Sequence, residues 1–89
     1  MVEYGYLVWY NYEIYEVLVR DNIGNVTVTV SAKNYSLDYS LNDDRLTIWL
    51  EDFVYEVTDA DEISDFLDDV ETLLTEGKIL YEEVVENEH

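Results

Sequence analysis

Apolar and polar side chains alternate with a period of two over most of residues 2–57. The clearest run is 35–41, where Tyr35, Leu37 and Tyr39 alternate with serine and aspartate. Such alternation, in segments rich in β-branched and aromatic residues, is typical of strands that bury one face. Six strands of about this kind are predicted, at 2–10, 12–20, 26–32, 35–41, 45–50 and 53–57. The turns between them are too short for parallel crossovers, so we expect an antiparallel β-meander.

The period changes to that of a helix after Val57. Asp59 and Glu62 form a capping box, and Gly77 suits the left-handed conformation that often ends a helix. Between them, large apolar residues recur at helical spacing, namely Ile63, Phe66, Leu67, Val70, Leu73 and Leu74. We therefore predict one C-terminal amphipathic helix at about 60–76 that packs across or inside a curled sheet, which makes the fold α+β. Residues 79–85 suit a short terminal strand or a second short helix, and we favour the strand.

The length of 89 residues predicts a single domain, 1–89, because a chain of this size buries only about 60–65% of its unfolded surface in one modest core. Hydrophobic residues make up 48% of the chain, enough for that core despite a net charge of −18. Without cysteine there is neither a disulfide framework nor a zinc–thiolate site. The N-terminal segment lacks the pattern of a signal peptide, so we expect a cytoplasmic protein, in the host cytoplasm if it is viral.

Acidic residues outnumber basic residues by 22 to 4. A surface of this charge repels phosphates and anionic lipid head groups, so we expect no direct binding to nucleic acid and none to a membrane. It attracts a basic protein instead, such as a nucleic-acid-binding enzyme or a nuclease. The excess is concentrated in residues 51–89, which hold fifteen acids and one base, whereas residues 1–50 hold seven acids and three bases.

The sequence shows no recognisable arrangement of catalytic residues. The only histidine is His89, at the end of the sequence, where it cannot complete a dyad or a metal site inside the fold. An EF-hand loop starting at Asp59 fails at Ile63, Ser64 and Val70, where calcium needs an oxygen ligand, a glycine and a bidentate carboxylate. We expect no enzyme, with no catalytic residues, no metal and no cofactor.

The predicted helix carries eight carboxylates from Asp59 onward and no base. At a rise of ~1.5 Å per residue they follow one another about every 3 Å, close to the ~3.4 Å spacing of phosphates along one DNA strand. Acidic pairs four residues apart destabilise a helix by ~0.2–0.5 kcal/mol each. A surface that carries such repulsion without a compensating base often has a function. A face that serves solubility alone is the alternative. The candidate partner-binding residues on the helix are Asp61, Glu62, Asp65, Asp68, Asp69, Glu71 and Glu76.

The chain also contains nine tyrosines and two tryptophans, more than so small a core encloses. Tyr4, Tyr6, Tyr10 and Tyr12 cluster on the first two predicted strands, so several aromatic side chains should be partly exposed on the sheet. Most tyrosines are expected to fill and edge the sheet, where aromatic residues are favoured. Trp9 and Trp49 lie on less regular strand faces and are the candidates for anchoring a partner or a homodimer.

In size and charge alone, the chain resembles the small acidic DNA-mimic, anti-restriction and anti-CRISPR inhibitors of phages and viruses. The hypothesis that follows is a non-enzymatic inhibitor that occupies the basic nucleic-acid site of a partner protein. An immunity protein that covers the cleft of a nuclease toxin would present the same surface. The alternative is a structural or assembly subunit instead of an inhibitor. It would be a homodimer built through the tyrosine-rich strands, and its acidity would serve solubility alone.

Overall fold

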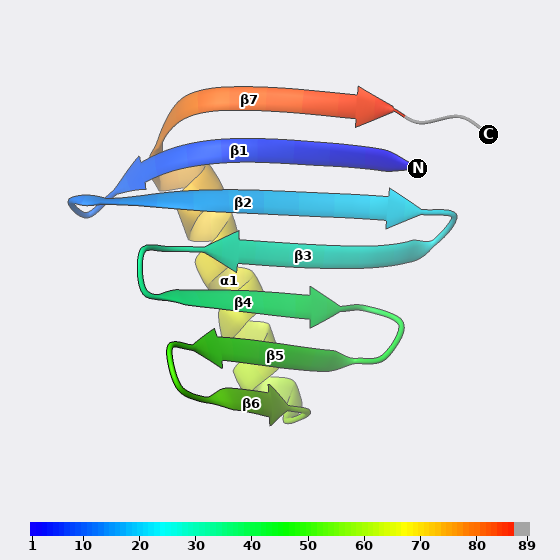
Figure 1. Ribbon diagram of the computed structural model, residues 1–89. Helices are drawn as coiled ribbons and strands as arrows, with labels where there is room; N and C mark the ends of the chain where they lie inside the picture. The colour runs from blue at the N-terminus through cyan, green and yellow to red at the C-terminus, as the bar shows by residue number, and fades with distance from the viewer. Residues whose placement is uncertain (87–89) are drawn as a thin grey trace.

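The computed structural model describes residues 1–86, which form one antiparallel sheet and one helix (Figure 1). The sheet has seven strands in the order β6-β5-β4-β3-β2-β1-β7. His89 lies outside the described residues. The elements are β1 (Val2–Tyr10), β2 (Glu13–Asn22), β3 (Asn25–Ser31), β4 (Tyr35–Ser40), β5 (Arg45–Leu50), β6 (Val54–Val57), α1 (Ala60–Glu76) and β7 (Lys78–Glu86).

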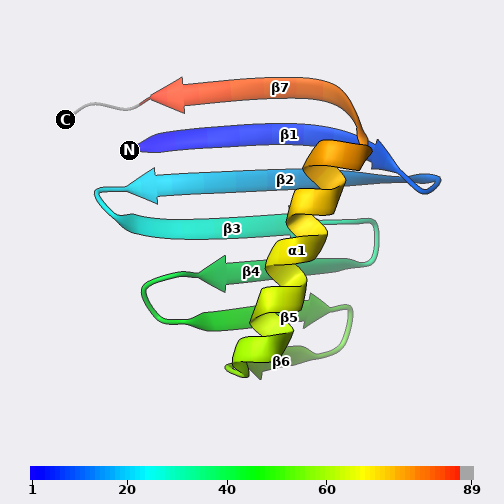
Figure 2. The same ribbon diagram turned by 180° about the vertical axis from the view of Figure 1, so that it is seen from behind.

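The predicted α+β fold, with its meander and C-terminal helix, is confirmed. The sheet is open, and α1 crosses it from the β6 edge to the β1 and β7 edge (Figure 2). The C-terminal segment is the seventh strand, as favoured over a second helix, and it pairs antiparallel with β1 from Val2 to Trp9, with an irregularity between Leu7 and Val8. Strand β7 thus supplies backbone hydrogen-bonding partners along the outer side of β1, which a second helix would not do.

The hydrophobic core lies between α1 and one face of the sheet. The helix buries Ile63, Phe66, Val70 and Leu73, which share one side of it. Burying each such side chain contributes roughly 1.5–3 kcal/mol. From the sheet they meet Val17, Val28, Val30, Tyr39 and Leu46, all less than a tenth exposed.

The opposite side of the sheet, here called the open face, has no element packed on it within residues 1–86 (Figure 2). Strand alternation sends every second residue there, and paired residues share a face. Its middle is made of small hydroxyl side chains, with Thr29 donating to Asp38 at 3.1 Å and the hydroxyls of Ser31 and Ser36 lying 3.3 Å apart. Its β7-β1-β2 end carries apolar side chains among charged ones, and the apolar ones are Leu7, Trp9, Ile14, Leu18, Tyr81 and Val85.

The two ends of α1 differ in part from the predicted caps. Asp59 is the N-cap, and its Oδ1 accepts a hydrogen bond from the Asp61 backbone N at 2.9 Å. Glu62, the expected second half of the capping box, instead lines a groove described below. Gly77 does follow the last helical residue, but its φ of −73° is extended, so the predicted left-handed conformation is wrong.

The reason for glycine at position 77 is a close approach of the backbone to β1. A Cβ atom there would collide with the Leu73 carbonyl oxygen and with Cγ1 of Val8. Val8 is fully buried. Glycine therefore lets the chain leave the helix and enter β7 directly against β1.

Replacing Gly77 with alanine is expected to lower the free energy of unfolding by about 1–3 kcal/mol, the usual cost of overpacking. Chemical denaturation would measure the loss. Gly5→Ala is the matched control, since a Cβ at that position would lie 3.4 Å from Cδ2 of Leu18, close to an ordinary contact. Equal losses in the two variants would contradict this account of Gly77.

The turn between β2 and β3 holds a strained residue. Ile23 and Gly24 form a two-residue hairpin loop with φ values of 52° and 81°, and two positive φ values are typical of a type I′ turn. Glycine adopts this conformation freely, but a β-branched residue does not. Ile23 is 96% exposed, so no burial offsets its strain.

We expect Ile23→Asn to raise the free energy of unfolding by about 1 kcal/mol, because asparagine tolerates the left-handed region and Asn-Gly is the preferred type I′ pair. The shift in the midpoint of urea denaturation reports this gain. Ile23→Val retains the β-branch and should leave the midpoint unchanged. A lower midpoint for the asparagine variant would contradict this expectation. It would mean that the Ile23 side chain stabilises the fold by more than its backbone strain costs.

Candidate partner-binding surface

All eight carboxylates of α1 and its N-cap are exposed in the structure. Their exposure follows from the burial of the apolar stripe, because all remaining sides of the helix then face solvent. The helix spans 17 residues, about 25 Å, which gives an acidic ridge across the whole sheet. The ridge consists of the seven predicted residues Asp61, Glu62, Asp65, Asp68, Asp69, Glu71 and Glu76 together with Asp59.

Within residues 1–86, no basic side chain forms an ion pair with the acidic ridge. The two ion pairs found there join Arg20 to Glu3 at 3.3 Å and Arg45 to Glu56 at 3.8 Å. All four of these residues lie on the open face of the sheet, away from α1. The charges of the ridge are therefore uncompensated.

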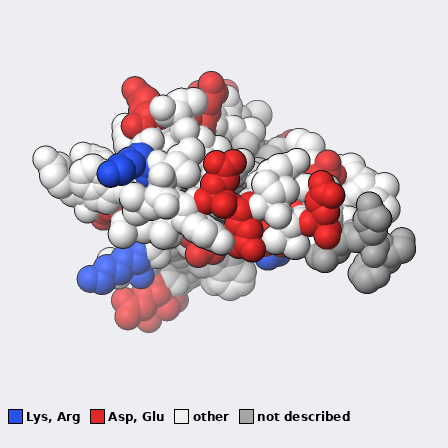
Figure 3. All heavy atoms as spheres, turned by 90° about the horizontal axis from the view of Figure 1, so that it is seen from above, with Lys and Arg blue, Asp and Glu red and all other residues white. Residues whose placement is uncertain are grey.

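The fold places three of the four bases on the face away from the ridge. Lys78 pairs with Trp9 and so joins Arg20 and Arg45 on the open face. The open face thereby holds three of the four bases, alongside the acids Glu3, Glu16, Asp38, Glu56 and Glu83. On the α1 side, the sheet adds only acids to the ridge: Glu13, Asp21, Glu82 and Glu86. The view from above shows how thinly basic groups are scattered among carboxylates (Figure 3).

Trp9 and Trp49 do not lie with the carboxylates. Both belong to the open face, where they are 43% and 49% exposed. They are also apart from each other, in β1 and β5, four strand spacings or roughly 19 Å across the sheet. The predicted site residues thus form two surfaces on opposite sides of the molecule, and one flat interface cannot include both.

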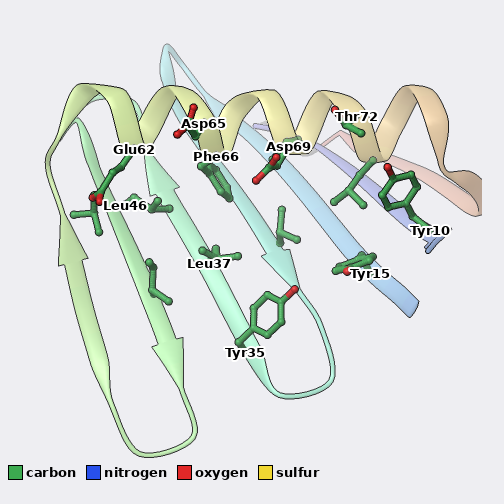
Figure 4. Close-up of a pocket in the computed structure, with 15 residues that line it drawn as sticks. Tyr10, Tyr15, Tyr35, Leu37, Leu46, Glu62, Asp65, Phe66, Asp69 and Thr72 are labelled. Atoms are coloured by element: carbon green, nitrogen blue, oxygen red, sulfur yellow. The ribbon is translucent and has the colours of Figure 1, made fainter. Parts of the chain in front are cut away.

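A groove that the sequence did not reveal runs between α1 and the sheet (Figure 4). Its volume is about 530 Å³, within the range typical of ligand sites. Its floor is apolar, and includes Leu37, Leu46, Ile48, Phe66 and Val70. On the helix side it is lined by the ridge residues Glu62, Asp65 and Asp69, and on the sheet side by Tyr10, Tyr15 and Tyr35.

The tyrosine wall of the groove is fixed by a hydrogen bond. The hydroxyl of Tyr15 donates to Oε2 of Glu13 at 2.8 Å. This bond to a carboxylate, together with burial and the neighbouring Tyr35 hydroxyl, holds the pKa of Tyr15 well above its ordinary value. Tyr15 therefore stays protonated and neutral at physiological pH, and the charge of the groove is that of its carboxylates.

Residues 1–86 contain no group of three or more aspartate, glutamate, histidine or cysteine side chains arranged to hold a metal ion. The helix in this part of the chain is neither long nor apolar enough to cross a membrane.

Comparison with known proteins gives no relative. No protein-family model, no curated protein and no solved structure matches this chain. The functional argument therefore depends on the geometry and charge of the surface itself.

Added salt is expected to raise the melting temperature, because screening weakens the repulsion within the acidic ridge. The Debye length falls from ~10 Å at 0.1 M to ~3 Å at 1 M, and each kcal/mol of relieved repulsion corresponds to about 4–8 °C in a domain of this size. Thermal unfolding in sodium chloride tests this directly. The rise should shrink in the variant Asp65→Asn with Asp69→Asn, which removes the two acidic pairs that these residues form at a spacing of four, 61/65 and 65/69. A melting temperature independent of salt would show that the ridge carries no repulsion.

Proposed function

We propose that this protein is a non-enzymatic inhibitor that uses the acidic ridge of α1 to occupy the basic nucleic-acid site of a partner protein in the cytoplasm. The observation that carries the proposal is the uncompensated ridge: eight exposed carboxylates on one helix, with no ion pair to a base in residues 1–86. Their spacing along the helix, about 3 Å per charge, is close to that of a phosphate backbone.

The placement of the bases supports the same proposal. A partner that approaches α1 meets mainly acidic groups, since three of the four bases lie on the open face. A field of one sign steers a basic partner towards the helix and accelerates association. An immunity protein against a basic nuclease would use the ridge in the same way and differ only in its partner.

The open face favours a second candidate function, that of a structural or assembly subunit. Its apolar end exposes Trp9, Ile14 and Tyr81 by 43%, 53% and 58%, and patches of this kind often mark interfaces. The β1 residues Tyr6 and Tyr10 do not contribute to this patch, because they pack against the core on the other side of the strand. A homodimer would therefore form through the open face of these strands and not through Tyr6 and Tyr10.

The test starts from proteins captured by the wild-type chain from cell lysate, each then purified and assayed for binding to DNA or RNA. The wild-type protein should compete with the nucleic acid, with an on-rate that falls steeply as salt is added. Asp65→Lys with Asp68→Lys should abolish this inhibition. Since both residues are exposed and their reversal relieves repulsion within the ridge, the fold should be retained and the melting temperature should not fall.

Trp9→Ala with Trp49→Ala is the matched control on the other side of the sheet. This variant should inhibit as well as wild type, because neither tryptophan borders the ridge. If the charge-reversed protein inhibited fully while the tryptophan variant lost its partner or its self-association, the assembly role would replace the proposed one.

A further inference from the structure

The groove between α1 and the sheet has the composition of a site for one particular side chain. We propose that it receives an arginine of the basic partner and so anchors that partner beside the acidic ridge. This inference rests on the proposed function, which it deepens by assigning a contact that the ridge alone does not provide.

The charge of the groove selects a cation. Glu62, Asp65 and Asp69 lie on its helix wall, and the hydroxyl of Tyr15 on its sheet wall donates to a fourth carboxylate, that of Glu13. Neither of the ion pairs in residues 1–86 involves any of these four carboxylates. An anionic ligand would be repelled, and a neutral one would leave the carboxylates without a charged partner as it displaces their water.

The rings and the floor select a cation with a flat head and an apolar stem. Tyr10, Tyr15 and Tyr35 are half-buried and stand at the groove opposite the helix (Figure 4). A guanidinium group stacks on aromatic faces and is more weakly hydrated than an ammonium group. The methylene stem of an arginine would cover the apolar floor, while the five N–H donors of its head reach carboxylates at the rim.

Lysine satisfies fewer of these features. Its ammonium group is a compact, strongly hydrated charge that cannot stack, so it would lose more hydration on entering a half-apolar groove. The structure therefore favours arginine over lysine in this position, although both would be attracted by the ridge outside.

The groove can be tested with small probes, independently of any partner. Nα-acetylarginine amide is titrated into the isotope-labelled protein and side-chain resonances are followed by NMR. We expect saturable shifts at Tyr10, Tyr35 and Phe66, with the corresponding lysine amide bound about threefold or more weaker. The norleucine amide, which has a neutral stem of similar size, should give no saturable shift. Equal binding of arginine and norleucine amides, or shifts confined to the outer helix surface, would overturn the inference.

Two variants with the same loss of charge give the matched comparison. Asp69→Asn removes a carboxylate that lines the groove, whereas Asp68→Asn removes its neighbour, which does not line it. The first should weaken the arginine probe about fivefold or more, and the second less than about twofold. Equal effects of the two substitutions would mean that the probe senses only the general field of the helix.

A third variant separates this inference from the proposed function. Tyr35→Leu removes an aromatic wall and leaves every charge of the ridge in place. It should weaken the arginine probe and the affinity for an inhibited partner, without changing the salt dependence of the on-rate. If it left both affinities unchanged, the groove would have no role and inhibition by the ridge would still stand. If the probe bound as expected but no captured protein lost nucleic-acid binding, the proposed function would fail while the site remained.

Discussion

The packing of one helix across one face of a seven-stranded sheet is the interaction on which the rest of the structure depends. The apolar stripe of α1 buries residues such as Phe66 and Val70 against valines and leucines of the sheet. Because that stripe must face inward, the remaining sides of the helix face solvent. The exposure of the carboxylates is thus a direct consequence of core formation, and any variant that preserves the stripe keeps these helix positions exposed.

Strand alternation adds the second property of the molecule, the separation of its charges. Arg20 and Arg45 occupy strand positions that point away from α1, where they pair with Glu3 and Glu56. A base on the open face cannot neutralise the ridge. The sheet lies between these bases and the ridge carboxylates, and the distance between packed layers, ~10 Å, is about the Debye length at physiological salt.

The groove arises because a single helix is narrower than the sheet it crosses. Strand ends reach beyond α1 on one side, and there the partly buried Leu37 and Ile48 line the groove together with Tyr15 and Tyr35. An acidic ridge beside an aromatic, partly apolar groove combines long-range attraction with a short-range anchor. The two contributions act on different steps, since charge steers association and a well-packed anchor slows dissociation.

The sequence by itself determined the strands, the helix and the acidity of the helix surface, because periodicity and charge are local properties of neighbouring residues. It also indicated Asp59 as the N-cap. Only the tertiary structure decided what depends on register and on contacts between distant segments. The pairing of β7 with β1 made Gly77 a point of close approach. The packing of α1 on one face of the sheet left Trp9 on the side opposite the ridge and brought Tyr15 and Asp69 to one groove. Residues so far apart in the chain meet because α1 returns across the whole sheet, and no local pattern encodes that crossing.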